Sequence, residues 1–310
     1  MDKKEIYKKL AILSILAIFL KDVPDDMFSI NYIPHFGFGN TDEYDDLITD
    51  SFNIKNKRDY IPQGLCVLED KILTTLYNKN PEVNSIISIT DRETKDVKIV
   101  RLNSASHSGG ICYDPVNKNI WISHIGGSAA CYKLEDILND NYVYPINIVN
   151  CSNGLDNYKG TQSIAYMCYN DGHLYVGNFN ILGQNTIMKE YKIDEDNLIY
   201  NKTYKMPNYV QGVAFLEGKM IVSRSYGPMN SSEIMIYDDI SKSLYNNDDY
   251  TIERGCSIET HSLQQQIQVV GDELFVLTES NSIIFDNCLT NTDDINVIEI
   301  DKLFEKVKKR

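Results

Sequence analysis

The sequence predicts an all-β chain folded as a five-bladed β-propeller, and three repeating features predict it. A two-strand hairpin recurs five times, with starts about 50 residues apart. Each hairpin is followed by a third strand that ends in an apolar-x-apolar-acid pattern, and four of the five units then add a fourth alternating segment. Five units of four strands, without helical repeats between them, are typical of a closed propeller.

The hairpins carry the clearest signal, because apolar and polar residues alternate on both sides of a short turn. They span Ile61–Tyr77, His107–Ile125, Thr161–Phe179, Val210–Tyr226 and Gln265–Ser280. The third strands are expected at Ile86–Asp91, Cys131–Asp136, Glu190–Asp194, Met235–Asp239 and Val297–Asp301. The fourth strands are expected at Val97–Leu102, Tyr144–Val149, Lys202–Met206 and Tyr250–Glu253, of which the last alternates least.

The fifth unit lacks a fourth strand, because the chain passes from "VIEID" directly into a charged tail, "KLFEKVKKR". The segment Ser51–Asn56, "SFNIKN", lies just before the first hairpin and shows the same alternation. We therefore expect this N-terminal strand to complete the last blade and to remove an exposed sheet edge. Residues 51–310 then form a single propeller domain, preceded by a lead-in at residues 25–50.

Residues 1–24 resemble a secretory signal or a membrane anchor. Lysines precede an apolar block, Ala11–Leu20, which is too short to span a bilayer as a helix. No small-x-small cleavage site follows the block. The segment predicts a secreted or cell-surface protein with possible N-terminal membrane association, and the alternative is a cytoplasmic protein with a buried N-terminal helix.

Composition excludes some partners and cofactors. The 30 basic and 44 acidic residues give a net charge of −14, which repels phosphate backbones, so we expect no nucleic-acid partner. Seven cysteines show no CxxC spacing and no neighbouring His in zinc-site order, so we expect no metal and no cofactor. Cys66 and Cys112 align with Ala165 and Ala214 of sister units, which predicts small, reduced core residues.

The alignment of the repeats gathers polar side chains at one end of the central channel, called the mouth below. The first strands begin with Gln63, Gly109, Gln162, Gln211 and Gln265. The second strands end with Leu76, His124, Asn178, Arg224 and Thr278, and Tyr77, Ser225 and Glu279 come one residue later. The candidate ligand-binding residues are Gln63, His107, His124, Gln162, Asn178, Gln211, Arg224, Gln265 and Glu279. The alternative is that the amides only satisfy the inward backbone groups of a narrow channel.

The residues at the mouth favour recognition over catalysis. The Arg224 guanidinium with amide donors suits a carboxylate, a phosphate or a hydroxyl-rich sugar. No paired carboxylates, nucleophile elbow or phosphate loop occurs, so no catalytic residue is identified. We predict a binding propeller that holds a small polar or anionic ligand, or a protein partner, at the mouth. The alternative is a hydrolase of lactones, phosphoesters or glycans that uses His107 or His124 as base and Arg224 as charge stabiliser.

Several segments together resemble a known group of proteins. "IPQGL", "HSGG", "YVQGVAF", "SRSYG" and "LFVLTES" are similar to the PQGL, HVGG, VQGVAF and SRSYG signatures of bacterial, often exported, β-propeller proteins of undefined activity. The resemblance covers about Tyr60 to Asp301, and at fold level the chain is also similar to YVTN-type and lactonase-type propellers. It implies the fold but no chemistry, because the group has no established catalytic residues. The fifth unit departs from the group, since "QQIQV" replaces a start that contains Gly.

Overall fold

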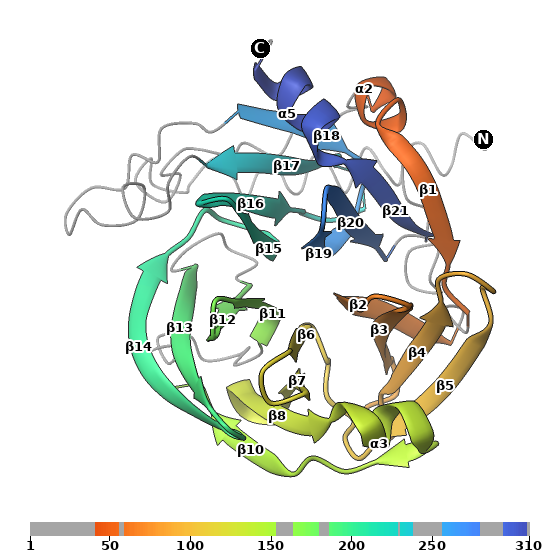
Figure 1. The fold of residues 1–310 in the computed structure, drawn as a ribbon, viewed down its shortest axis with the longest axis vertical. Coiled ribbons are helices and arrows are strands. Elements are labelled where there is room, and N and C mark those ends of the chain that lie inside the picture. Colours follow the sequence, from red (N-terminus) through yellow and green to blue (C-terminus); the bar gives the residue numbers. More distant parts are fainter. Residues whose placement is uncertain are drawn as a thin grey trace, which may run out of the picture. The chain divides into compact units, whose positions relative to one another are not determined.

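The computed structural model describes residues 41–55, 59–152, 164–179, 186–228, 230–237, 256–279 and 294–308. All of them belong to one compact unit, Pro34–Arg310, whereas Met1–Ile33 is a separate unit outside the described residues. The described strands form five sheets arranged around a centre (Figure 1). The predicted five-bladed β-propeller is confirmed. Among the described residues, no helix is long and apolar enough to cross a membrane.

Each sheet is one blade, and its strands run outward from the channel in chain order. The first blade contains β2 (Tyr60–Val67), β3 (Lys71–Asn78), β4 (Ile86–Asp91) and β5 (Val97–Leu102). The second contains β6 (Ile111–Asp114), β7 (Asn119–His124), β8 (Ser128–Lys133) and β10 (Asn147–Asn150). The third contains β11 (Ile164–Asn170), β12 (His173–Asn178), β13 (Ile187–Asp194) and β14 (Asn197–Lys205). The fourth contains β15 (Val210–Leu216), β16 (Lys219–Arg224), β17 (Ser232–Tyr237) and β18 (Cys256–Thr260).

The fifth blade joins the two ends of the described chain. It contains β19 (Gln264–Val270), β20 (Glu273–Thr278), β21 (Asp294–Glu299) and, as its outermost strand, β1 (Ile48–Asn53). β1 pairs antiparallel with β21, from Ile48 opposite Ile298 to Asn53 opposite Asp294. This strand begins three residues before the predicted Ser51 and ends three residues before Asn56.

The core consists of five apolar clusters, one in each gap between adjacent blades. The alternation of the strands produces this arrangement, because each blade presents one set of side chains to each neighbour. Trp121 is fully buried between the second and third blades, and Phe52 packs on Phe275 between the fifth and first. Burial of each such side chain stabilises the fold by about 1.5–3 kcal/mol.

Two fourth strands differ from the prediction. The chain between Tyr142 and Asn150 first forms β9 (Tyr142–Val143), which pairs in parallel with β5 of the first blade, and only then enters β10. Pro145 separates the two strands, because proline has no N–H to donate to a ladder. In the fourth blade, the predicted Tyr250–Glu253 lies outside the described residues, and the strand that pairs with β17 is β18.

Among the described residues, three short α-helices lie outside the ring of strands: α2 (Asp42–Asp45), α3 (Leu134–Asn139) and α5 (Ile300–Lys308). The predicted charged tail is α5, in which Ile300, Leu303 and Val307 lie on one helical face and are buried against the fourth and fifth blades. Tyr44 of α2 is buried in the same cluster. The helices therefore extend the apolar gap between these two blades.

Candidate functional site

Ladder pairing shows which first-strand residues are equivalent. A bulge interrupts the inner ladder of four blades, and the bulged residues are Gln63, Ala165, Gln211 and the pair Gln265–Gln266. In the third blade, the residue at this bulge is Ala165, and not Gln162 as the sequence alignment predicted. Gln162 lies outside the described residues. The sequence alignment slipped by three residues because "QSIAYM" imitates "QGVAFL".

The same slip affects the predicted core cysteines. Cys168, and not Ala165, is level with Cys66, Cys112 and Ala214. Cys66 and Cys112 are buried free thiols in the first two gaps between blades, and burial raises the pKa of Cys66 to about 12. Their predicted role as small, reduced core residues is confirmed.

The strand pairing confirms the predicted alignment of the ends of the second strands. Leu76, His124, Asn178, Arg224 and Thr278 lie at one level. Glu279, one residue beyond Thr278, is 7% exposed. Gln63 Nε2 donates a hydrogen bond to Glu279 Oε2, and the Gln265 side chain also bonds this carboxyl. One carboxyl is thus held by amides from two adjacent blades.

The surroundings of Glu279 keep it protonated at neutral pH. Burial raises its pKa from 4.5 to about 8, and the hydrogen bonds from Gln63 and Gln265 offset only part of this rise. Glu279 in turn raises the pKa of Tyr77, which burial brings to about 12. The carboxyl and the phenol are therefore both uncharged donors at pH 7.

Tyr77 connects Glu279 to His107. The Tyr77 and His107 rings lie 4.4 Å apart between centroids, with an interplanar angle of 33°. The His107 residue is exposed, and desolvation by the protein atoms around its ring lowers its pKa to about 4, so the ring is neutral at pH 7. Gln63, Tyr77, His107, Gln265 and Glu279 are called the mouth cluster below.

Arg224 lies inside the protein and not in the opening. Its side chain is 2% exposed, Nε donates to Asn208 O at 2.8 Å, and NH1 donates to Met235 Sδ at 3.0 Å. The same NH1 lies 3.4 Å from Glu233 Oε2. In this structure the guanidinium is a buried ion-pair partner, so it does not present its charge to a ligand.

The other candidates are held by backbone contacts or lie at the strand ends. Asn178 Oδ1 accepts a hydrogen bond from Ile187 N at 2.8 Å and so fixes the start of β13. His124 is half-buried at the end of β7, and burial lowers its pKa. Gln211 is half-buried at its bulge.

The sequence prediction missed the residue that crosses the channel, Gln266. Its Nε2 lies 2.9 Å from Leu65 O, 2.6 Å from Ile111 O and 2.9 Å from Met167 O, and its Oε1 accepts from Ile111 N at 3.1 Å. Gln268 makes a similar pair of bonds to Val67 alone. The Gln266 and Gln268 amides therefore satisfy inward backbone groups of the channel. The alternative hypothesis predicted this role for Gln side chains, but it assigned the role to the amides at the mouth.

Glycines allow neighbouring inner strands to approach one another closely. At the same level of the inner strands stand Gly64, Gly110 and Gly212. A Cβ on Gly64 would lie 2.4 Å from Thr75 Oγ1, and one on Gly212 would lie 2.8 Å from Ile267 N, so no larger residue fits. The departure "QQIQV" in the fifth unit was the available signal, because it places a Gln where three other blades have Gly and the third blade has Tyr166.

Within the part of the chain that the structure describes, no group of three or more His, Cys, Asp or Glu side chains could hold a metal ion. The segment Cys256–Leu263 holds a Cys, a Glu and a His close together in the sequence. It forms β18 and the link to β19, and His261 Nε2 lies 2.7 Å from Asp45 Oδ1. The His261 imidazole thus contacts α2 through Asp45.

Comparisons with known proteins add no chemistry to the site. No protein-family model matches the sequence, and no curated protein matches it either. Among solved structures, the nidogen/laminin complex has 13% identity over 71% of this chain and 73% of that chain, with a TM-score of 0.45. The β-propeller domain of Myceliophteria thermophila Cps50 (Swd1) has 12% identity over 75% and 67%, with a TM-score of 0.38. The WD40 β-propeller domain of Doa1 has 10% identity over 79% and 71%, with a TM-score of 0.38.

Proposed function

We propose that the protein is a binding propeller that holds a small, uncharged polar ligand at the mouth cluster. The observation that carries the proposal is the Glu279 carboxyl, buried at the opening of the channel and held by amides of two blades beside the exposed His107 ring. Burying a carboxyl is unfavourable, and groups with strongly shifted pKa values gather at functional sites. The mouth of a propeller is also a concave region where several blades converge.

The charge state of the cluster favours a neutral ligand. At pH 7 Glu279 and Tyr77 retain their protons and His107 is neutral, so the cluster offers O–H and N–H donors together with amide and imidazole acceptors. The predicted preference for anions depended on Arg224, whose charge is buried against Glu233. Hydroxyl-rich or amide-containing molecules match the remaining groups.

A thermal-shift screen of sugars, polyols and nucleosides tests the proposal. A ligand that binds only the folded protein raises its stability by about 2.7 kcal/mol at 100 times its dissociation constant. His107→Ala, at an exposed position, is expected to keep the fold and to weaken binding of each true ligand about tenfold, or about 1.4 kcal/mol. His173→Ala, at the start of β12 at the other end of the third blade, is the control. Equal binding by wild type and His107→Ala would contradict the site.

One observation favours a hydrolase as the second candidate. The raised pKa of Glu279 keeps a proton available at neutral pH, as a general acid requires, and the lowered pKa of His107 leaves it free to accept one. Turnover of lactone or phosphoester substrates that is lost in Glu279→Gln, with binding retained, would favour catalysis over binding.

We also propose that the protein is exported. The proposal is based on the lysines that precede the apolar block Ala11–Leu20. Fractionation of cells that express the full chain should recover it outside the cytoplasm, and deletion of residues 1–24 should retain it inside.

A further inference from the structure

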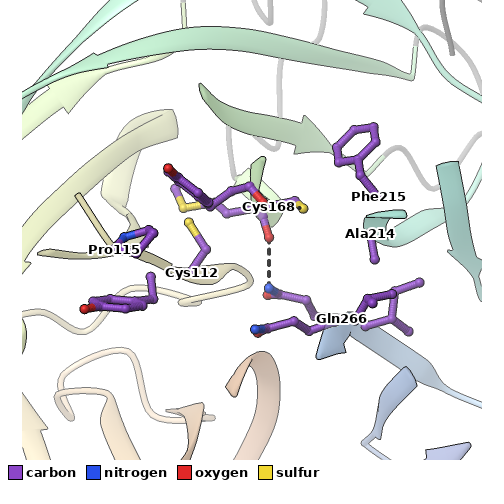
Figure 2. A pocket seen from close by; sticks show the side chains of 12 residues that line it. Cys112, Pro115, Cys168, Ala214, Phe215 and Gln266 are labelled. Carbon is purple, nitrogen blue, oxygen red and sulfur yellow. Dashed lines mark hydrogen bonds between the residues drawn. The ribbon is translucent and has the colours of Figure 1, made fainter. Parts of the chain in front are cut away.

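The channel holds a second cavity at the end opposite the mouth, and nothing in the proposed function uses it. Its volume is about 250 Å³, and it is lined by residues from β6, β11, β15 and β19 together with Pro115 (Figure 2). Cys112 and Pro115 lie on one side, Ala214 and Phe215 on another, and Gln266 lies between this cavity and the mouth. The hydrogen bonds of Gln266 to three other inner strands separate the two ends of the channel.

We propose that this cavity binds a neutral aromatic ring that carries one hydrogen-bonding group, such as a phenol or an indole. The lining contains no charged residue, and it includes aromatic rings (Tyr113, Tyr169 and Phe215) and two thiols (Cys112 and Cys168). Aromatic rings and sulfur atoms attract a flat ring by dispersion and by edge contacts. An apolar cavity of about 150 Å³ already accepts benzene, so this one has room for a substituted ring.

The two amides of the lining already have partners, so an apolar ring displaces none of their bonds. Gln266 and Gln268 are bonded to backbone groups of β2, β6 and β11. Cys168 Sγ lies 3.5 Å from Tyr169 O, and Asp114, next to the cavity, accepts bonds within its own turn from Val116 N at 3.0 Å and Asn117 Nδ2 at 2.7 Å. A charged ligand would find no counter-ion among the lining residues.

The strand edges supply a place for a single polar group. β6, β11, β15 and β19 are each the first strand of a sheet, so their inner edges have no ladder partner and face the channel. Backbone N–H and C=O groups on such an edge bond to water or to a ligand. A ring with one O–H or N–H matches this combination of apolar walls and a polar edge better than a hydrocarbon does.

Indole is the probe for the experiment, and Cys168 is its reporter, because this thiol lines the cavity and is partly exposed. The dissociation constant of indole comes from a thermal-shift titration of the full chain. N-ethylmaleimide modification of Cys168 is then followed by peptide mass spectrometry with and without indole. At ten times the dissociation constant, the rate is expected to fall about tenfold. Burial raises the pKa of the Cys168 thiol and slows its modification both with and without indole. This effect cancels because only the ratio of the rates with and without indole is used.

A thiol introduced by Ile199→Cys provides the control. Ile199 is 50% exposed on β14, the outermost strand of the same blade, and indole should not change the modification rate of this introduced thiol. Cys168→Leu, which fills part of the cavity, should abolish the indole-dependent rise in melting temperature. If this variant does not fold, the modification rates in the native protein still decide. Equal Cys168 rates with and without indole, or equal protection of both thiols, would overturn the proposal.

Discussion

At the scale of single residues, Gln266 links several blades, because its one side-chain amide connects β19 to three other inner strands. Gln266→Ala leaves backbone groups of those strands without a protein partner, and each buried unsatisfied group costs about 1–3 kcal/mol. We expect a loss of about 3 kcal/mol in the free energy of unfolding, measured by urea denaturation. Gln268→Ala, which affects only Val67, is the matched control and should cost about 1 kcal/mol. A larger loss for Gln268→Ala would contradict the assigned role.

Glu279 should give the fold a distinct pH dependence. The unfolded carboxyl ionises near pH 4.5, whereas the folded one retains its proton up to about pH 8. The folded state therefore holds more protons in this window, and the stability contributed by Glu279 is lost as pH rises from about 4.5 to 8. Glu279→Gln cannot ionise, so its stability relative to wild type should rise over the same window, by at most about 1.4 kcal/mol per pH unit.

Urea denaturation of both proteins at pH 5, 6, 7 and 8 measures this difference. The lowered pKa of His107 acts in the opposite direction below pH 6.5, but it is present in both proteins and largely cancels in the difference. Glu217→Gln, in the exposed turn between β15 and β16, is the control and should show a flat difference. A flat difference for Glu279→Gln would show that the carboxyl ionises normally in the folded protein.

At the scale of elements, β1 contributes more stability than its length suggests. Deletion of residues 1–58 removes β1 and α2, and with them the buried Tyr44, Leu47, Phe52 and Ile54. At about 1.5–3 kcal/mol for each side chain the loss approaches the whole stability of an ordinary domain. We expect aggregation or a much lower melting temperature, measured by circular dichroism. Deletion of residues 1–24 should change little, and an unchanged melting temperature for the longer deletion would refute closure by β1.

Period-two alternation and hairpin turns predicted most of the strands, because these signals depend only on neighbouring residues. The errors occurred where pairing across blades decides the structure. The third blade slipped by three residues because "QSIAYM" imitates "QGVAFL", whereas its ladder places Ala165 at the bulge that the blades share. The parallel pairing of β9 and the face of α5 depend on the blades that they touch, and "QQIQV" shows its meaning only when four strands meet at Gln266.

At the scale of the whole molecule, the alignment predicted which polar residues lie together more accurately than it predicted their charge and burial. Alignment brought Gln63, Gln265 and Glu279 to one opening, and the structure joins them in hydrogen bonds. It could not predict that Arg224 turns inward to Glu233, or that Glu279 retains its proton, because burial and partner choice depend on residues distant in the sequence.

The pairing of β1 with β21 also imposes an order on how the chain acquires its structure during synthesis. Ile48–Asn53 leaves the ribosome before its partner Asp294–Glu299, which lies about 240 residues later in the chain (294 − 53 = 241). At about 5–20 residues per second, β1 waits unpaired for roughly ten seconds or more. During this time four blades can form their internal ladders, while the ring stays open and the edge of β1 is available to other nascent chains. Synthesis of β21, and not the folding of any single blade, then becomes the step that commits the protein to its closed form.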